Sequence, residues 1–281
     1  MKHLTALFFF LVTAAQAEQF QAPVTDTEWL VTESPLECSL SQKITGFGSA
    51  KFTQLPGQEF SLTFITSLHP SKQTNIYFEI AEAPWQNTDE RLYLSSVSAK
   101  NNQKEFTISG ELAKQAFTYI DEGKFPTIRY QGHKSGGEID VLLSTIHFRD
   151  SHLAFTQCVE ALSPYTFEQM RNLTVHFNLE ESTLHQDAKE ALTKIADYVK
   201  IDDKVKQILV SGHTDNHGRK RINIPLAEAR AVVVKNFLIE ECDVPEKLIT
   251  TSWHREFIAA TTNKTLAGRA QNRRAEIELI R

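Results

Sequence analysis

The amino-acid sequence predicts an α+β protein in which an N-terminal, mostly antiparallel β domain precedes an α/β sandwich with helices on one face of a small mixed sheet. From about Ile44 to Phe148, short runs alternate apolar and polar residues, as antiparallel strands do. From Asn172 onward, short strands alternate with segments of helical periodicity. The halves also differ in charge, since residues 18–164 hold 18 acidic and 11 basic residues whereas residues 165–281 hold 17 acidic and 18 basic.

The first 17 residues have the composition of a secretory signal peptide. Lys2 precedes an apolar run, and Ala15-Gln16-Ala17 offers the small residues that signal peptidase accepts. We therefore expect cleavage before Glu18 and export of the protein. The apolar run is too short to span a bilayer and no later segment reaches the required length, so we expect no membrane span.

The N-terminal domain, residues 18–164, is expected to contain the strands KFTQL, EFSLTFIT, NIYFEI, RLYLSSV, EFTIS, TIRYQ and IDVLLSTIHF. A helix should begin at Ser109 or Gly110 and stop at Gly123, because its apolar residues recur on one face. A second helix is expected over residues 151–162, with Leu153, Cys158 and Leu162 facing inward.

The second domain, residues 165–281, is expected to contain the strands NLTVHF, VKQILVSG, LITTSW and AEIELI. Ser182 or Thr183 should cap a first helix that continues to about Val199. Pro225 suits the first turn of a second helix that runs to about Glu241. Helices and strands in this order predict helices packed on one face of the sheet.

Three cysteines follow the signal peptide, namely Cys38, Cys158 and Cys242. In an oxidising compartment two of them can form a disulfide, and their spacing allows any of the three pairings. The acidic balance of the exported chain also argues against nucleic-acid binding, because phosphate contacts need a basic face.

The stretch VSGHTDNHG raises the question of a metal site. On an extended backbone His213, Asp215 and His217 would share one face, and these residue types bind zinc. Turn-forming residues interrupt the alternation, however, and the basic run 219–221 follows at once and would repel a cation. We therefore expect no metal.

Catalytic patterns are weak throughout the chain. No serine lies in a strand-turn-helix elbow, and Cys242 has no histidine or asparagine whose role the sequence helps to assign. Carboxylate pairs for glycoside cleavage are compatible with the composition, but nothing nominates a particular pair. We therefore expect a protein that is not an enzyme and that carries no cofactor.

Arg230 is the most informative residue of the second half. It lies four residues after Leu226 and three before Val233, so a helix places it on the apolar face, where a guanidinium needs a partner. In one interpretation it pairs with Asp215 or extends to solvent. In the other, Asp215 holds an ammonium group and Arg230 holds a carboxylate, which suits a zwitterion such as the diaminopimelate of peptidoglycan.

These residues also resemble a known family. Thr214-Asp215, Leu226-Ala227, Arg230-Ala231, Val234 and Leu238, with a closing motif of Asn263-Lys264-Thr265, Gly268-Arg269 and Asn272-Arg273-Arg274, are similar to the signature of OmpA-like peptidoglycan-binding domains. The resemblance covers about residues 172–281 and implies that Asp215, Arg230 and Asn223 bind diaminopimelate, with Thr214 and Arg273 as further candidates. Two positions depart from the family: Ala227 replaces a usual serine, and Ser252-Trp253-His254 replaces a usual Gly-x-Gly.

The N-terminal half holds a second set of characteristic segments, namely Pro35–Cys38, Phe47–Phe52, Ala83–Trp85, Gly123–Pro126 with Tyr130-Gln131, and Ala154–Cys158. These segments resemble the MotY family of periplasmic T-ring proteins in sodium-driven flagellar motors. This resemblance implies a disulfide between Cys38 and Cys158 and leaves Cys242 free. It also implies a periplasmic location, a MotX-like T-ring partner, association with the flagellar basal body, and assembly of stator units that peptidoglycan binding anchors.

Two other classes of protein were weighed against this interpretation. One is an OmpA-type outer-membrane or cell-wall tether without a motor role; charges such as Glu79, Glu82 and Lys104 interrupt the short strands and disfavour lipid-facing strands. The other is a zinc-dependent wall hydrolase with its metal at His213, which predicts stoichiometric zinc and turnover of wall fragments.

Overall fold

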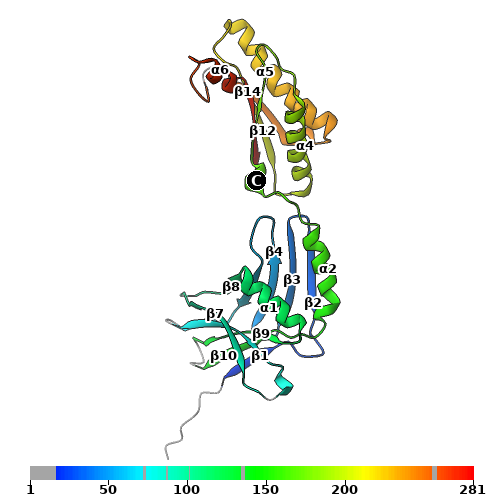
Figure 1. The fold of residues 1–281 in the computed structure, drawn as a ribbon, viewed down its shortest axis with the longest axis vertical. Helices are drawn as coiled ribbons and strands as arrows, with labels where there is room; N and C mark the ends of the chain where they lie inside the picture. The colour runs from blue at the N-terminus through cyan, green and yellow to red at the C-terminus, as the bar shows by residue number, and fades with distance from the viewer. Residues whose placement is uncertain (1–16, 72–73, 87, 101, 134–136, 255–257) are drawn as a thin grey trace, which may run out of the picture. The chain divides into compact units, whose positions relative to one another are not determined.

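The computed structural model describes residues 17–281, except residues 72–73, 87, 101, 134–136 and 255–257. The expected signal peptide, residues 1–17, lies outside the described residues apart from Ala17. The chain forms two compact units, the first ending at Leu162 and the second spanning Ser163–Arg281 (Figure 1). The sequence had placed this boundary two residues later, after Pro164.

The first unit combines two sheets with two helices. One sheet has the strand order β2-β3-β4-β5-β8 and the other has the order β1-β10-β9-β6-β7. All the pairings are antiparallel except that of β1 with β10. The elements are β1 (Glu18–Gln21), β2 (Trp29–Ser34), β3 (Glu37–Ile44), β4 (Gly48–Gln54), β5 (Ser61–Thr66), β6 (Asn75–Ala81), the 3-10 turn Pro84–Gln86, β7 (Arg91–Ser98), β8 (Glu105–Ser109), α1 (Glu111–Asp121), β9 (Phe125–Gln131), β10 (Glu138–Leu142) and α2 (Phe148–Glu160).

The structure confirms the strands expected after Ile44, except that the last was expected to reach Phe148 and ends at Leu142, and it adds β1, β2 and β3 before them. These early strands are rich in serine, glutamine and glutamate, so they lack a clear apolar alternation. Tertiary contacts stabilise them instead. The fully buried Gln42 of β3 donates to the main-chain oxygen of Ser144 and accepts from its N–H, both at 2.9 Å.

Aromatic side chains fill the core of this unit. The Phe117 ring of α1 meets Phe52 edge-to-face with centroids 5.1 Å apart, and it also contacts Phe148 and Phe155 of α2. The expected orientation of α2 was wrong in one respect, because Leu153 is 64% exposed. The helix begins earlier than expected, at Phe148, and buries Phe148, Phe155 and Cys158.

A disulfide joins the sheet to α2. It links Cys38 of β3 to Cys158, with their Cα atoms 5.9 Å apart, which is the pairing that the family resemblance implied. Cys242 is free and buried in the second unit.

The second unit is an α/β sandwich with a mixed sheet of order β11-β14-β12-β13, in which only β12 and β13 are parallel (Figure 1). Helix α5 packs on β12 and β13, and α4 contacts β11. The elements are α3 (Phe167–Met170), β11 (Asn172–His176), α4 (Gln186–Ile201), β12 (Gln207–His213), α5 (Lys220–Asn236), the π-helical turn Phe237–Glu241, the 3-10 turn Glu246–Leu248, β13 (Ile249–His254), α6 (Leu266–Asn272) and β14 (Arg274–Ile280).

The expected strands of this unit are confirmed, but both helix starts were wrong. Helix α4 begins at Gln186 with His185 at its N-cap, and neither Ser182 nor Thr183 caps it. Helix α5 begins five residues before Pro225, which lies inside it. Pro225 has no N–H to donate to the carbonyl of Arg221, four residues earlier in the helix.

Short helix α6 was not expected from the sequence. It begins after Thr265, whose hydroxyl accepts a hydrogen bond from the N–H of Gly268. A side chain at Gly268 would overlap the main-chain oxygen of Thr262, so glycine permits this close turn. None of the described helices has both the length and the apolar composition of a membrane-crossing segment.

Candidate functional site

All five ligand-binding residues proposed from the sequence line one cleft of the second unit. Thr214 and Asp215 follow β12, Asn223 and Arg230 project from α5, and Arg273 lies between α6 and β14. The rim is completed by Leu179, Glu180, His217, Gly218, Ile222 and Leu226. The cleft therefore brings together five predicted side chains that are as much as 59 positions apart in the sequence.

The close packing of β12 against α5 places these residues. A methyl group at Gly212 would overlap the main-chain oxygen of Ala227, so this glycine lets the helix approach the strand directly. Ala227, one of the two departures from the family pattern, is fully buried at this contact. The second departure lies on the edge strand β13, where Trp253 is 44% exposed.

Arg230 is fully buried, which confirms its expected place on the apolar face of α5. Its guanidinium donates to three main-chain oxygens: Nε to Glu181 at 2.9 Å, Nη1 to His213 at 2.7 Å and Nη2 to Asn178 at 3.1 Å. It also lies over the ring of Phe177, 5.2 Å from the centroid. Burial lowers the pKa of Arg230 to about 10, while the nearby charge of Asp215 acts in the opposite direction.

Asp215 pairs with Arg273 and not with Arg230. Its Oδ2 accepts from Nη1 of Arg273 at 3.1 Å, and its Oδ1 accepts from the N–H of His217 at 2.9 Å. The first interpretation of Arg230, pairing with Asp215 or extension to solvent, was therefore wrong, since in the described residues it neither bonds Asp215 nor reaches solvent. Main-chain oxygens accept the hydrogen bonds of its guanidinium instead. The sequence did not identify these acceptors, because every residue type carries a main-chain oxygen.

The other two candidates occupy different polar environments. Asn223 is buried, and its Nδ2 donates to the main-chain oxygen of Asp215 at 3.3 Å. Thr214 is 2% exposed, and its hydroxyl has no hydrogen-bond partner among the described residues. The cleft thus contains one buried polar group that is available to a ligand.

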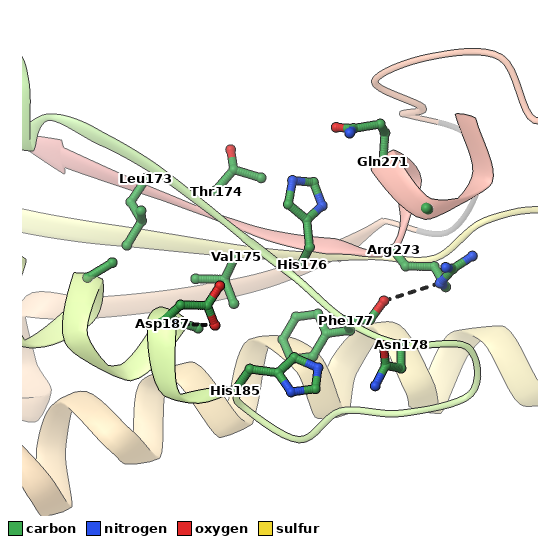
Figure 2. Close-up of a pocket in the computed structure, with 13 residues that line it drawn as sticks. Leu173, Thr174, Val175, His176, Phe177, Asn178, His185, Asp187, Gln271 and Arg273 are labelled. Carbon is green, nitrogen blue, oxygen red and sulfur yellow. Dashed lines mark hydrogen bonds between the residues drawn. The ribbon is translucent and has the colours of Figure 1, made fainter. Parts of the chain in front are cut away.

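The closing motif forms hydrogen bonds to the segments that line the cleft. Nδ2 of Asn272 donates to Oδ1 of Asn263 at 2.8 Å, and the same oxygen accepts from the N–H of Asn216 at 3.3 Å. Arg273 in turn donates through Nε to the main-chain oxygen of Phe177 at 3.2 Å (Figure 2). These bonds connect the turn after β12 to the segments before α6 and after β11.

Two positive and two negative side chains line the cleft, and little space is left within it. The guanidinium groups of Arg230 and Arg273 accompany the buried carboxylate of Asp215 and the exposed carboxylate of Glu180. The free volume is about 10 Å³, which is room for about one water molecule. The site is therefore closed in this structure.

Of the residues in the zinc hypothesis, Asp215 and His217 line the cleft but His213 does not. Strand β12 ends at His213, which is 1% exposed and lies 3.4 Å from a carboxylate oxygen of Glu276 and 5.4 Å, between ring centroids, from His254. Burial, with the charge of Arg274, lowers the pKa of His213 to about 4. Within the part of the chain that the structure describes, no group of three or more histidine, cysteine, aspartate or glutamate side chains is placed to hold a metal ion.

Comparison with known proteins assigns both units. The MotY N-terminal domain family matches residues 20–164, and the OmpA family matches residues 176–273. The sodium-type flagellar protein MotY of Vibrio parahaemolyticus is 27% identical over 272 residues, which cover 95% of this chain and 92% of that protein. The peptidoglycan-binding protein ArfA of Mycobacterium tuberculosis is 36% identical over 88 residues, or 31% of this chain and 26% of that protein.

Among solved structures, the C-terminal domain of Helicobacter pylori MotB is 25% identical with a TM-score of 0.36, covering 39% of this chain and 84% of that one. The matched family ranges follow the two structural units, with the first ending near Leu162 and the second lying within Ser163–Arg281. The chain therefore belongs to the MotY family, with a MotY N-terminal domain followed by a domain of the OmpA family.

Proposed function

We propose that this chain is a periplasmic component of a sodium-driven flagellar motor and that it binds peptidoglycan through the cleft of its second unit. Three similarities support the proposal: the MotY N-terminal domain, the OmpA domain, and the relation to a Vibrio MotY over nearly the whole chain. ArfA, which matches part of the second unit, carries peptidoglycan binding in its name.

The convergence of Asp215, Asn223, Arg230 and Arg273 on one cleft is the observation that carries the proposed site. The buried carboxylate of Asp215 can exchange its guanidinium partner, Arg273, for a ligand ammonium group. The guanidinium groups can in turn donate hydrogen bonds to a ligand carboxylate. A ligand with both groups on one carbon matches this arrangement, and the free end of diaminopimelate is such a ligand.

Binding must open the cleft, because its free volume is about 10 Å³. We infer that the ligand ammonium replaces Arg273 at Asp215 and that the ligand carboxylate replaces the main-chain oxygens of Asn178 and Glu181 at Arg230. Asp215 and Arg230 then both keep hydrogen-bond partners, and the groups that they release belong to the exposed residues Asn178 and Glu181 and to the half-buried Arg273, which can bond to water. A ligand with only one of the two charges would leave Asp215 or Arg230 without a partner.

For the first unit we propose association with the flagellar basal body, together with a MotX-like partner, in a T ring that gathers stator units. The MotY family assignment of residues 20–164 supports this role. A stator that pushes on a rotor needs an anchor that bears the reaction force, and wall binding by the second unit provides one. We expect no catalytic activity and no cofactor in this role.

Sedimentation with purified peptidoglycan sacculi tests the site. Asp215→Asn preserves the shape of the side chain but removes its charge, and we expect binding to fall by about ten- to hundredfold, as for the loss of a charged hydrogen bond. Asp197→Asn is the matched control, because Asp197 is exposed on α4 and its nearest basic partner, Lys200, is 3.8 Å away. Equal sedimentation of the two variants would refute the assignment of the cleft.

Localisation in cells tests the motor role. A tagged chain should gather at flagellar bases in cells that assemble basal bodies and should spread through the periplasm in cells that lack them. A chain with Asp215→Asn should still gather at the bases, because the first unit is intact. Identical localisation in both kinds of cell would instead favour a general cell-wall tether.

A further inference from the structure

A groove of about 460 Å³ runs along the free edge of β11, beside the closed cleft. The consecutive residues Leu173–Asn178 form its floor, so the groove follows the strand edge and not one face of the sheet. One wall comes from the start of α4, with His185, Asp187, Ala188 and Ala191, and the other from Ala270, Gln271 and Arg273. The small alanines leave the strand edge uncovered.

Two residues of β11 direct their main-chain groups into this groove. Phe177 donates to the oxygen of Arg273 at 2.9 Å, and the oxygen of Arg171 accepts from Leu279 at 2.8 Å. Hydrogen-bonded residues alternate in an antiparallel ladder, so Thr174 and His176 point their N–H and C=O groups away from β14. Strand β11 is at the edge of its sheet, and these groups therefore face the groove.

The side chains leave this edge accessible. Figure 2 shows Thr174 and His176 on one side of the strand and Leu173 and Val175 on the side of α4. Val175 is buried, whereas Thr174 and His176 are exposed. An extended chain in the groove would therefore meet main-chain donors and acceptors between a polar side and an apolar side, as in the addition of a strand to a sheet edge.

Arg273 connects the groove to the cleft, because it lines both. Its Nε holds the oxygen of Phe177 and its Nη1 holds Asp215. A ligand whose charged end enters the cleft therefore passes Arg273 and continues along β11.

We propose that the groove binds the peptide stem of peptidoglycan as a short added strand, with its diaminopimelate end in the cleft; this inference rests on the proposed function. Thr174 and His176 are separated by two residues, or roughly 6.7 Å along a strand. A γ-linked glutamate separates the amides on either side of it by about 6 Å when extended. The two amides of the stem tripeptide thus match the two outward-facing residues, and a short peptide suits this edge better than a long protein strand.

The start of α4 adds no favourable charge for the same ligand. Its N-cap residue, His185, makes no capping hydrogen bond with its side chain and lines the groove, but Asp187 of the first turn lines it as well. The carboxylate of Asp187 already accepts from the N–H of Ala188 at 2.9 Å, so it occupies the position that an anion would take at a helix N-terminus. The choice of a stem peptide therefore depends on the main-chain groups of β11 and on the link to the cleft through Arg273.

Calorimetric titration of the full chain with two probes tests the proposal: free meso-diaminopimelate, and the tripeptide L-alanyl-γ-D-glutamyl-meso-diaminopimelate. We expect the tripeptide to bind more tightly. Thr174→Pro removes an outward N–H, which an edge strand tolerates, and should weaken tripeptide binding about tenfold while leaving free diaminopimelate unchanged. Thr174→Ala is the control, because it keeps the N–H and should bind both probes as the parent does.

Ala191→Gln gives a second variant that does not alter the strand, since its longer side chain occupies the groove from α4. It should also weaken binding of the tripeptide but not of free diaminopimelate. This variant replaces Thr174→Pro in the test if circular dichroism shows that Thr174→Pro does not fold. Unchanged tripeptide binding in the folded variants would overturn the proposal and would leave a protein segment as the occupant to seek.

The same titration separates a failure of the groove proposal from a failure of the proposed function. If the unaltered chain binds both probes with equal affinity, only the groove is wrong. If it binds neither probe, the proposed function fails, and this inference fails with it.

Discussion

Arg273 donates a 3.1 Å hydrogen bond to the carboxylate of Asp215, and this ion pair closes the cleft in which Arg230 is buried. The side chain of Asp215 is 5% exposed and that of Arg273 is 17% exposed. Such a pair is only weakly screened by solvent, so each partner depends on the other. The ion pair therefore contributes to the stability of the second unit as well as closing the proposed binding site.

Arg273→Gln should lower the free energy of unfolding of the second unit by about 1–3 kcal/mol, because it leaves the Asp215 carboxylate without its charged partner. Urea denaturation followed by circular dichroism measures this change. Arg171→Gln is the control, since Arg171 forms an exposed ion pair with Glu278 at 3.3 Å, and such pairs contribute less than about 1 kcal/mol. Equal effects of the two substitutions would contradict a special role for the Arg273 pair.

Removal of the disulfide should destabilise the first unit selectively. Cys38 and Cys158 are 120 residues apart, and a loop of this size corresponds to about 5 kcal/mol in the chain-entropy model. In the double variant Cys38→Ser, Cys158→Ser, the unfolding transition of the first unit should move to lower urea while that of the second unit stays in place. Cys242→Ser should spare the first unit, and a single shared shift of both transitions would argue against two independent units.

The second unit should lose stability in mild acid through His213. Burial lowers the pKa of His213 from 6.5 to about 4, so between these values the unfolded chain takes up a proton that the folded chain does not. The free energy of unfolding therefore falls as the pH falls from about 6.5 to 4, by at most about 3 kcal/mol, and this contribution is constant at lower pH.

His213→Leu isolates this contribution, because leucine fills the same buried space without titrating. Urea unfolding at pH 7.5 and at pH 5 should show a smaller loss for the variant than for the parent. Equal losses in the two proteins would mean that other groups, such as protonating carboxylates, account for the acid sensitivity.

Gly212→Ala should damage the cleft from a distance. Its methyl group would overlap the main-chain oxygen of Ala227 and lie 3.0 Å from the nitrogen of Ala231, so α5 must move away from β12. Overpacking of this kind costs about 1–3 kcal/mol, and the displacement would carry Arg230 with it. We expect a lower melting temperature and weaker sedimentation with sacculi, whereas neighbouring Ser211→Ala, which loses only its hydroxyl contact with Ser252 at 2.8 Å, should leave sedimentation unchanged.

The spacing of apolar residues predicted the strands correctly where local preference and tertiary contacts favour the same structure. The strands from β4 to β10 and all four strands of the second unit were expected because their apolar residues alternate or cluster. Strands β2 and β3 were missed because their stability depends on contacts such as that of Gln42 with Ser144, 102 positions away. The start of α4 was misplaced by two or three residues, because His185 and not Ser182 or Thr183 takes the N-cap position.

By itself the sequence predicted the residues that line the cleft: residue type and helical spacing singled out Arg230 and Asp215, and the family resemblance added Asn223, Thr214 and Arg273. Only the tertiary structure decided the partners: Arg273 for Asp215, and three main-chain oxygens for Arg230. The same holds for the open groove along β11, whose edge position follows from strand order. Strand order and main-chain hydrogen bonds depend on contacts between distant segments, and side-chain identity does not encode them locally.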